Sequence, residues 1–518
     1  MSNKEEGYIF WRLAYSFISN HGYRVIQLFE NQKELWLEKL ENKKAPIIRM
    51  LLHNLDWSNA LQRDIEFTAS NGERVRKQIG RSELNVLNIY VSEFPPVDEY
   101  EFRLTKPFVF PKGNKTIVNS ILLTKELLES GFGEVSERIG SEVHFDFHEV
   151  DSEQAVEELK RSALNLANNK VKAERDLLFS GKPLFTYVFI VIQLAVFLWL
   201  QFHGGSTNTS TLIKYGAKVN ALIYQGEWWR LIAPVFLHIG FLHLVMNTLA
   251  LYFLGTTVER IFGKTRFLLI YLFAGFTGFI ASFLFSSNLS AGASGAIFGC
   301  FGALLYFGVV FPKLFSRTMG MNLIVVLGIN LVFGFSTSGI DNAGHLGGLF
   351  GGFLAAGITH LPKIKKTPWQ IVFLIASAAI VWSSLSYGFS SSVQSKDEDS
   401  TLLMAQEYVK QGDYDQAYKL LTNTEENASN LSDRTYFLLS FVEIKKNMLP
   451  EAKKHLQKAI KLNPKLDEAY FNLALINLEQ KNLKQAKLNA EKAAELDPQK
   501  VQYSDLVNEI NKQLQDSE

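Results

Sequence analysis

Two glycine-rich motifs contain the residues of this sequence that are best suited to chemistry. Ser294, in the run Gly292-Ala293-Ser294-Gly295, opens one apolar segment, and His345, also beside glycines, opens another about fifty residues later. A serine hydroxyl that meets an imidazole can act as a nucleophile with a general base. Because lipid tolerates ionisable side chains poorly, such a residue in an apolar segment indicates a functional site. Ser294 and His345 therefore predict covalent hydrolytic chemistry.

Close helix packing is the alternative explanation for each motif taken alone. Small residues four apart, such as Gly295 and Gly299, let membrane helices approach one another, and Gly344, Gly348 and Gly352 form a second ladder of this kind. The two explanations are compatible. Glycine ladders that bring two backbones together also help to bring serine and histidine within the ~2.6–3.2 Å of a hydrogen bond.

A third polar group lies in an earlier apolar segment, which also contains His238. His243 and Asn247 are four residues apart, so they share one face of a helix. With the backbone N–H of Ser294 near a helix N-terminus, these two side chains could stabilise an oxyanion. Hydrogen bonding between helices is the alternative role for this pair.

The elements that must position these residues are membrane helices. Residues 183–389 contain seven apolar segments, each near the ~20 residues that a spanning helix needs. The segments are expected at about 184–202, 232–254, 266–286, 293–311, 320–336, 343–361 and 369–389.

Loop charges predict the orientation of these segments. Lysine and arginine occur in the loops after the second, fourth and sixth segments, whereas the loops at 287–292 and 337–342 contain none. Lys214 and Lys218 in the first outer loop are mild exceptions. By the positive-inside rule, the N-terminus is cytoplasmic and the C-terminus is outside. The serine and histidine motifs then both lie near the outer face.

Soluble regions flank the apolar segments. Residues 1–180 predict a cytosolic α/β domain, because short apolar runs alternate with charged stretches. Its expected strands are Tyr23–Phe29, Pro46–Leu52 and Leu84–Val91, and its expected helices are Trp57–Ile79, Thr116–Ser130 and the charged Asp151–Lys182.

A repeat occupies residues 401–518, after a polar linker at 390–400. Leu462-Asn463-Pro464 and Leu496-Asp497-Pro498 are 34 residues apart, and Ala452 and Ala486 share that spacing. This period is typical of tetratricopeptide repeats (TPRs). It predicts an all-α solenoid whose concave groove binds protein partners.

An alternating stretch in the N-terminal region predicts a metal site. On a strand, His144, Asp146 and His148 share one face. Imidazoles with a carboxylate suit Zn or Mn, so this domain could sense a regulatory divalent metal. A solvated polar face on an edge strand is the alternative.

Charge balance and cysteine content are the notable features of the composition. The 53 basic and 52 acidic side chains balance, so overall charge says nothing about partners. A membrane protein with hydrolytic chemistry is expected to have no nucleic-acid partner. The one cysteine, Cys300, excludes a disulfide framework and is expected to be a packing residue.

Taken in order, the motifs resemble the rhomboid family of intramembrane serine proteases. The resemblance covers about 190 to 200 residues and rests on Glu227-Trp228-Trp229-Arg230, the spacing of His238, His243 and Asn247, Gly255 to Glu259-Arg260 and Gly263, Gly292-Ala293-Ser294-Gly295, and Ala343-Gly344-His345-Leu346-Gly347-Gly348. It implies a core of six helices with an added seventh, a Ser294–His345 dyad, an oxyanion site that includes His243 and Asn247, and catalysis without a cofactor.

The resemblance also implies a substrate class. Membrane proteins with helix-destabilised transmembrane segments would be cleaved near the outer face, in membrane-protein regulation or quality control. Trp229, Arg230, Glu259 and Arg260 would be structural.

Two other classes remain open. A polytopic transporter would place paired ionisable residues near the bilayer midplane on several helices, whereas the polar residues here gather toward one face. A non-catalytic scaffold that binds membrane proteins through its repeats would function unchanged after Ser294→Ala. The sequence favours a multi-pass serine endopeptidase of the cell membrane, with an extracellular TPR region.

Overall fold

The computed structural model of the protein is organised as two units, residues 1–176 and 177–518. The structure describes residues 4–111, 113, 115–143, 153–179, 181–337, 339–362, 364–365, 367–394, 397–428 and 430–517.

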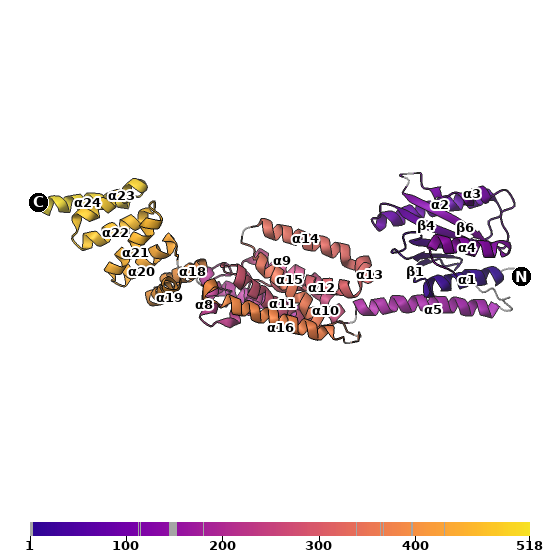
Figure 1. The fold of residues 1–518 in the computed structure, drawn as a ribbon, viewed down its shortest axis with the longest axis horizontal. Coiled ribbons are helices and arrows are strands. Elements are labelled where there is room, and N and C mark those ends of the chain that lie inside the picture. Colours follow the sequence, from indigo (N-terminus) through magenta and orange to yellow (C-terminus); the bar gives the residue numbers. More distant parts are fainter. Residues whose placement is uncertain are drawn as a thin grey trace. The chain divides into compact units, whose positions relative to one another are not determined.

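The N-terminal unit contains a six-stranded sheet covered by helices on both faces (Figure 1). The strand order is β1-β2-β3-β4-β6-β5, and β3, β4 and β6 run parallel in its centre. Helices α1, α4 and α5 share one apolar core with the sheet, and α2 and α3 share another. The bounds are α1 Lys4–Ser19, β1 Arg24–Leu28, β2 Glu34–Glu38, β3 Ile47–Leu52, α2 Ser58–Gln78, β4 Leu84–Val91, α3 Glu101–Thr105, β5 Phe108–Val109, β6 Thr116–Leu123, α4 Leu128–Ile139 and α5 Glu153–Leu178.

One predicted helix in this unit is wrong. The stretch Thr116–Ser130 begins as strand β6, which pairs in parallel with β4 from Thr116 to Leu123, and a helix starts only at Leu128. A short apolar run has no clear period, and pairing with a neighbouring strand decides its conformation. The antiparallel strand β2 was not anticipated either.

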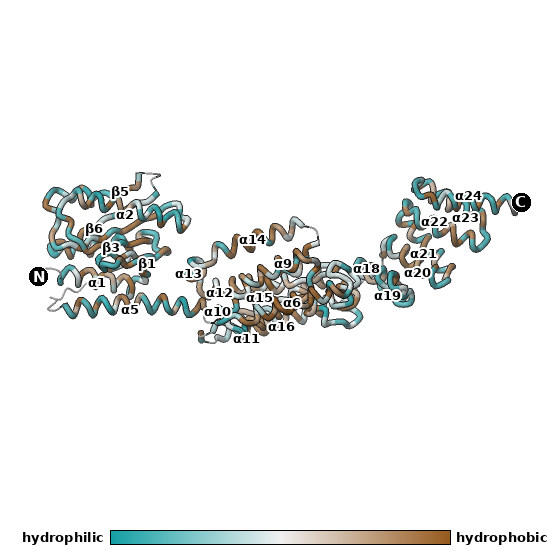
Figure 2. The backbone as a smooth tube through the Cα atoms, turned by 180° about the vertical axis from the view of Figure 1, so that it is seen from behind, coloured by the Kyte–Doolittle hydropathy of each residue, from teal (hydrophilic) through white to brown (hydrophobic). Residues whose placement is uncertain are grey.

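The membrane part of the second unit consists of apolar helices, along which the hydrophobic colouring of Figure 2 is concentrated. Among the described residues, five helical stretches are long and apolar enough to cross a membrane: Phe185–Phe202, Phe241–Phe262, Lys264–Phe285, Pro312–Ser336 and Trp369–Gly388. Between them lie the shorter apolar helix α12, Ser294–Val310, and the glycine-rich α15, Asn342–Thr359. The other bounds are α6 Phe185–Phe202, α7 Thr209–Lys214, α8 Asn220–Tyr224, α9 Phe241–Ala250, α10 Thr256–Phe262, α11 Lys264–Phe285, α13 Pro312–Phe315, α14 Met321–Ser336 and α16 Trp369–Gly388.

The second apolar segment differs from its predicted bounds of 232–254. Its helix begins only at Phe241, because the preceding residues form short 3-10 turns, one of which contains Pro234. The helix then continues through a π-helical turn, Leu251–Gly255, as far as Phe262. His238 therefore lies in the loop before this helix, whereas His243 and Asn247 lie on it.

Glycines bring three helices of this part into backbone contact. A Cβ on Gly348 of α15 would lie 1.9 Å from the carbonyl oxygen of Gly295 on α12, and one on Gly352 would lie 2.1 Å from that of Gly299. On the other side of α15, a Cβ on Gly351 would lie 1.8 Å from the hydroxyl oxygen of Thr277 on α11. The predicted close approach of the two glycine ladders is confirmed.

The C-terminal part of the second unit is a series of antiparallel helix pairs, as the 34-residue period predicts. Ala417, Ala452 and Ala486, which recur at corresponding positions, are fully buried where the helices cross. The helices are α17 Ser391–Gln394, α18 Glu398–Lys410, α19 Tyr414–Asn427, α20 Asp433–Lys445, α21 Leu449–Leu462, α22 Asp467–Glu479, α23 Leu483–Leu496 and α24 Val501–Ser517.

Candidate active site

The predicted nucleophile and base lie in contact at the N-terminal ends of two packed helices. Ser294 is the first residue of α12, and His345 lies in the first turn of α15. The distance between Ser294 Oγ and His345 Nε2 is 2.8 Å, which is a hydrogen bond. The glycine contacts between α12 and α15 set this spacing, since any larger residue at Gly348 would push the two backbones apart.

An aromatic ring fixes the orientation of the imidazole. Phe298, one helical turn after Ser294, stacks on His345 with 4.3 Å between ring centroids and 9° between planes. Phe298 therefore packs against one face of the imidazole and leaves Nε2 directed at the serine. Phe298 was not anticipated, although its position four residues after Ser294 on the same helix face was a usable signal.

Among the described residues, no third side chain is hydrogen-bonded to the imidazole of His345. His345 Nδ1 is buried and has no hydrogen-bond partner among the described residues. Asp341, the nearest acidic residue in sequence, uses one carboxylate oxygen to accept from Gly344 N at 2.8 Å and the other to accept from Ser290 Oγ at 2.7 Å. When Ser294 donates to Nε2, the ring hydrogen resides on Nδ1.

His243 lies against the loop that leads into α12. A Cβ on Gly292 would lie 2.7 Å from His243 Cε1 and 2.9 Å from its Nε2, so only glycine permits this contact. The backbone N–H of Ile239 donates to His243 Nδ1 at 3.4 Å, which leaves Nε2 as the ring donor. This donor faces the backbone two residues before Ser294.

Asn247 and His238 both contact His243, and among the described residues neither side chain is hydrogen-bonded to Ser294 or His345. Asn247 is buried, and its Nδ2 donates to the carbonyl of His243 at 2.9 Å, which leaves one amide hydrogen uncommitted. His238 is fully buried beside His243, with 5.4 Å between ring centroids, and neither of its ring nitrogens has a partner among the described residues. The N–H of Ser294, at the start of α12, has no acceptor within its own helix.

Arg230 and Glu259 hold a loop and a helix end, in agreement with their predicted structural roles. Arg230 pairs with Glu227 at 2.6 Å and donates to two loop carbonyls, those of Ile213 and Ala217, at 2.8 Å each. Trp229 packs on the same guanidinium, whose carbon is 4.5 Å from the ring centroid. These contacts organise the loop between α6 and α9.

Glu259 is buried on α10 and caps another helix. Its carboxylate accepts from the backbone N–H groups of Leu184, Phe185 and Thr186 at 2.7 to 2.9 Å, and from the Thr186 hydroxyl at 2.7 Å. These donors are the groups at the start of α6 that no helical carbonyl can satisfy. The role of Glu259 is therefore structural.

The predicted metal residues His144, Asp146 and His148 lie outside the described residues. Within the described part of the chain, no group of three or more His, Cys, Asp or Glu side chains could hold a metal ion. The regulatory metal therefore stays a prediction.

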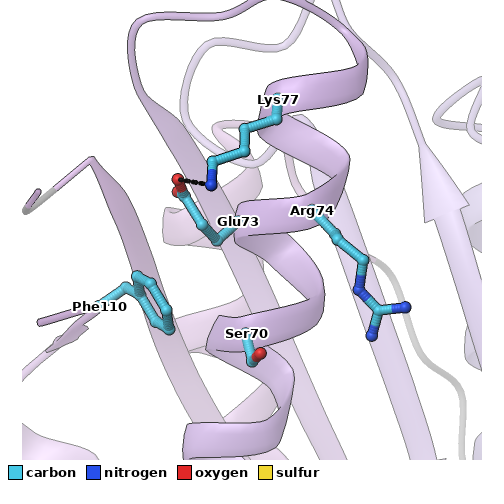
Figure 3. A pocket seen from close by; sticks show the side chains of 5 residues that line it. All are labelled: Ser70, Glu73, Arg74, Lys77 and Phe110. Atoms are coloured by element: carbon cyan, nitrogen blue, oxygen red, sulfur yellow. Dashed lines mark ion pairs between the residues drawn. The ribbon is translucent and has the colours of Figure 1, made fainter. Parts of the chain in front are cut away.

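A surface hollow of the N-terminal unit has no catalytic character. It is lined by Ser70, Glu73, Arg74, Lys77 and Phe110 (Figure 3). Hydrogen bonds from the Arg76 guanidinium and the Thr116 hydroxyl lower the pKa of Glu73 to about 2. Because this carboxylate is committed to structural partners, Glu73 is not available as a general acid or base.

Family comparisons agree with the geometry at Ser294 and His345. A family model described as "Rhomboid domain" matches residues 225–362, a range that contains both side chains. Models described as "TPR repeat" and "Tetratricopeptide repeat" match residues 442–481 and 467–500. A further model, "Anaphase-promoting complex, cyclosome, subunit 3", matches residues 376–459.

Individual proteins resemble this chain over different lengths. "Rhomboid protease GluP" from Bacillus subtilis (strain 168) is 41% identical over 461 residues, which cover 88% of this chain and 89% of that protein. "Putative rhomboid protease YdcA" from the same organism is 36% identical over 177 residues, 33% of this chain and 87% of its own length.

Solved TPR structures are similar only in part. The match to the first TPR of Spaghetti (RPAP3), bound to an HSP90 peptide, covers 22% of this chain and 90% of that chain. The sequence identity is 21% and the TM-score is 0.21, so this likeness says nothing about function. The relationship to GluP extends over most of both proteins, and the Rhomboid match contains the serine and histidine in contact. This chain therefore belongs to the rhomboid family of intramembrane serine proteases and has TPRs at its C-terminus.

Proposed function

We propose that this protease cleaves transmembrane or juxtamembrane segments of membrane proteins near the outer membrane face, with Ser294 as nucleophile and His345 as general base. The observation that carries the proposal is the 2.8 Å contact between Ser294 Oγ and His345 Nε2 at the N-terminal ends of two buried, glycine-packed helices. This geometry is that of a nucleophile and base ready for proton transfer.

The reaction proceeds in two stages. His345 Nε2 takes the proton from Ser294 Oγ as the oxygen attacks the scissile carbonyl carbon, and a tetrahedral oxyanion forms. The imidazolium then gives this proton to the leaving amine, the C–N bond breaks, and an acyl-enzyme remains. In the second stage His345 Nε2 takes a proton from water as the water oxygen attacks the ester carbonyl carbon. It then gives this proton to Ser294 Oγ as the ester C–O bond breaks and the acid product leaves. The chemistry uses only side chains of this chain and water, without a cofactor.

His243, Asn247 and the backbone N–H of Ser294 are the proposed oxyanion donors. The uncommitted Nε2–H of His243 beside Gly292, one amide hydrogen of Asn247 and the free N–H at the start of α12 support these assignments. Donors held in place before the reaction stabilise the developing charge without a cost of reorganisation.

A substrate assay with mapped products tests the function. The protein and a single-span substrate are reconstituted in proteoliposomes, and the cut site is identified by mass spectrometry. A helical peptide bond is shielded from attack, so the substrate must unwind locally. Replacing two glycines near the outer end of the substrate helix by alanine makes unwinding about 2 kcal/mol harder, which is expected to slow cleavage about thirtyfold. Cleavage near the cytoplasmic end, or at the same rate in both substrates, would contradict the proposal.

The proposed topology places seven spans in the membrane, the N-terminus in the cytoplasm and the TPR region outside. Lysine and arginine in the alternate loops support it. Asn430→Cys in the TPR region is expected to react with a membrane-impermeant maleimide in intact cells, and Lys43→Cys only after lysis, because both positions are exposed. The native Cys300 is buried and gives little background. If only Lys43→Cys were labelled in intact cells, the orientation would be the opposite of the one proposed.

The repeats suggest protein partners, and we infer that their groove binds extracellular segments of substrates or of other proteins. A stacked series of helix pairs presents a concave surface suited to an extended peptide. The alanine-packed crossings of the described helices support a rigid array of this kind.

A further inference from the structure

The loop between α11 and α12 leads directly into the nucleophile and is held from two sides. The first holder is the outer-loop residue Lys218, whose backbone pairs with Ser290 in an isolated antiparallel bridge. Lys218 N donates to Ser290 O at 2.8 Å, and Ser290 N donates to Lys218 O at 3.1 Å. The position of Ser290, four residues before Ser294, is therefore set by a different part of the chain.

The Lys218 side chain strengthens this hold. It is fully buried, and its Nζ donates to the carbonyls of Ser286 at 2.5 Å and Asn288 at 3.2 Å. Ser286 is the C-cap of α11, where the carbonyls of a helix end favour a positive charge. Burial of an ammonium group is costly unless it is well hydrogen-bonded, so Lys218 serves as a deep anchor for the loop.

The second holder is Asp341, which reaches the loop from the other catalytic helix. It is the N-cap of α15, where its carboxylate accepts from Gly344 N at 2.8 Å and its backbone carbonyl accepts from His345 N at 3.0 Å. Its other carboxylate oxygen accepts from Ser290 Oγ at 2.7 Å. One side chain thus joins the loop before Ser294 to the helical turn that contains His345.

This link adds to the glycine packing, because no side chain caps the first turn of α12. The N-cap of α12, Ala293, provides no side-chain cap, and Ser294 is the very first helical residue. The first turn of a helix frays unless its N–H groups are satisfied. Gly348 packs this turn against α15 through Gly295, and Gly352 packs the next turn through Gly299, but neither contact reaches the loop before Ser294.

The geometry points to Asp341 as a positioning residue of this protease. Through Ser290 and the cap of α15, and with Lys218 anchoring the loop, it keeps Ser294 Oγ within hydrogen-bond reach of His345 Nε2. This inference rests on the proposed Ser294–His345 dyad. Asp341 contacts neither ring nitrogen of His345, so it acts through the backbone and not as a third catalytic group.

The test measures kcat and KM of the full chain in proteoliposomes, together with the rate at which a fluorophosphonate labels Ser294. Asp341→Ala is expected to lower kcat and the labelling rate about 30- to 100-fold with KM changed less than about twofold, because a misplacement of about 1 Å can cost that much. Asp341→Asn is expected to retain most activity, since its amide can accept from Gly344 N and donate to Ser290 Oγ.

Ser290 provides an independent arm that does not disturb the helix cap. Ser290→Ala is expected to lower kcat about three- to tenfold, and Ser290→Thr to restore it, because threonine keeps the hydroxyl. The double variant Asp341→Ala with Ser290→Ala is expected to lose no more than Asp341→Ala alone, which is the mark of a shared interaction. These variants keep the inference testable even if Asp341→Ala fails to fold.

Asn208→Ala is the matched control. Asn208 caps α7 by accepting from Ser210 N at 2.9 Å, and within the described part of the chain its side chain makes no hydrogen bond to α12 or α15. It is expected to leave kcat unchanged. Full kcat in Asp341→Ala, an equal loss in Asp341→Asn, or an unaffected Ser290→Ala would each overturn the inference. If Ser294→Ala retained cleavage, the dyad itself would fail, which is a separate and recognisable result.

Discussion

Ser294→Ala and His345→Ala are each expected to lower kcat for a single-span substrate by at least about 10⁴-fold, because a nucleophile and its base act as one unit. The double variant is expected to be no slower than either single variant. The measurement is single-turnover cleavage in proteoliposomes, with rates followed over several days.

Both variants are expected to remain folded. Loss of the Ser294 hydroxyl removes one hydrogen bond, worth about 1 kcal/mol. His345 Nδ1 already lacks a partner among the described residues, so its removal leaves no new unsatisfied group there. Thermal unfolding in detergent checks this point. His203→Ala, at an exposed histidine directly after α6, is the matched control and is expected to keep full activity. Substantial cleavage by either dyad variant would reject the assignment.

Gly348→Ala is expected to abolish at least about 99% of the activity without touching a reacting group. Its new Cβ would lie 1.9 Å from the carbonyl oxygen and 2.6 Å from the carbonyl carbon of Gly295, and both atoms belong to the backbone of α12. Neither helix can yield locally, so α12 and α15 must separate. The bond between Ser294 and His345 is then stretched beyond its range, and overpacking costs about 1–3 kcal/mol of stability.

Gly328→Ala is the matched control for this substitution. Gly328 lies on α14, and a Cβ there would meet no atom within 4 Å. Activity and unfolding temperature are expected to stay close to those of the unchanged protein. Cleavage assays and thermal unfolding of the two variants side by side give the comparison. A Gly348→Ala protein as active as Gly328→Ala would mean that the glycine contact does not set the dyad geometry.

Residue types and their spacing were enough to predict the contact between Ser294 and His345, the close approach of the glycine ladders and the TPR helices. These features depend on local rules. Glycine has no side chain that could keep two helices apart, and residues four apart lie on one helix face. A 34-residue repeat is typical of stacked helix pairs.

Other features required the folded chain, because they depend on which distant segments meet. Thr116–Leu123 became a strand through pairing with β4, although its sequence alone suggested a helix. Phe298 gained its role from the position of the His345 ring, and Asp341 from a hydroxyl 51 residues away. A hydrogen bond or ring stack needs atoms placed to within a few tenths of an ångström. The spacing of residues in the sequence predicts helix faces and the ends of segments. The packing of α11, α12 and α15 determines the distance between the Ser294 hydroxyl and the His345 ring.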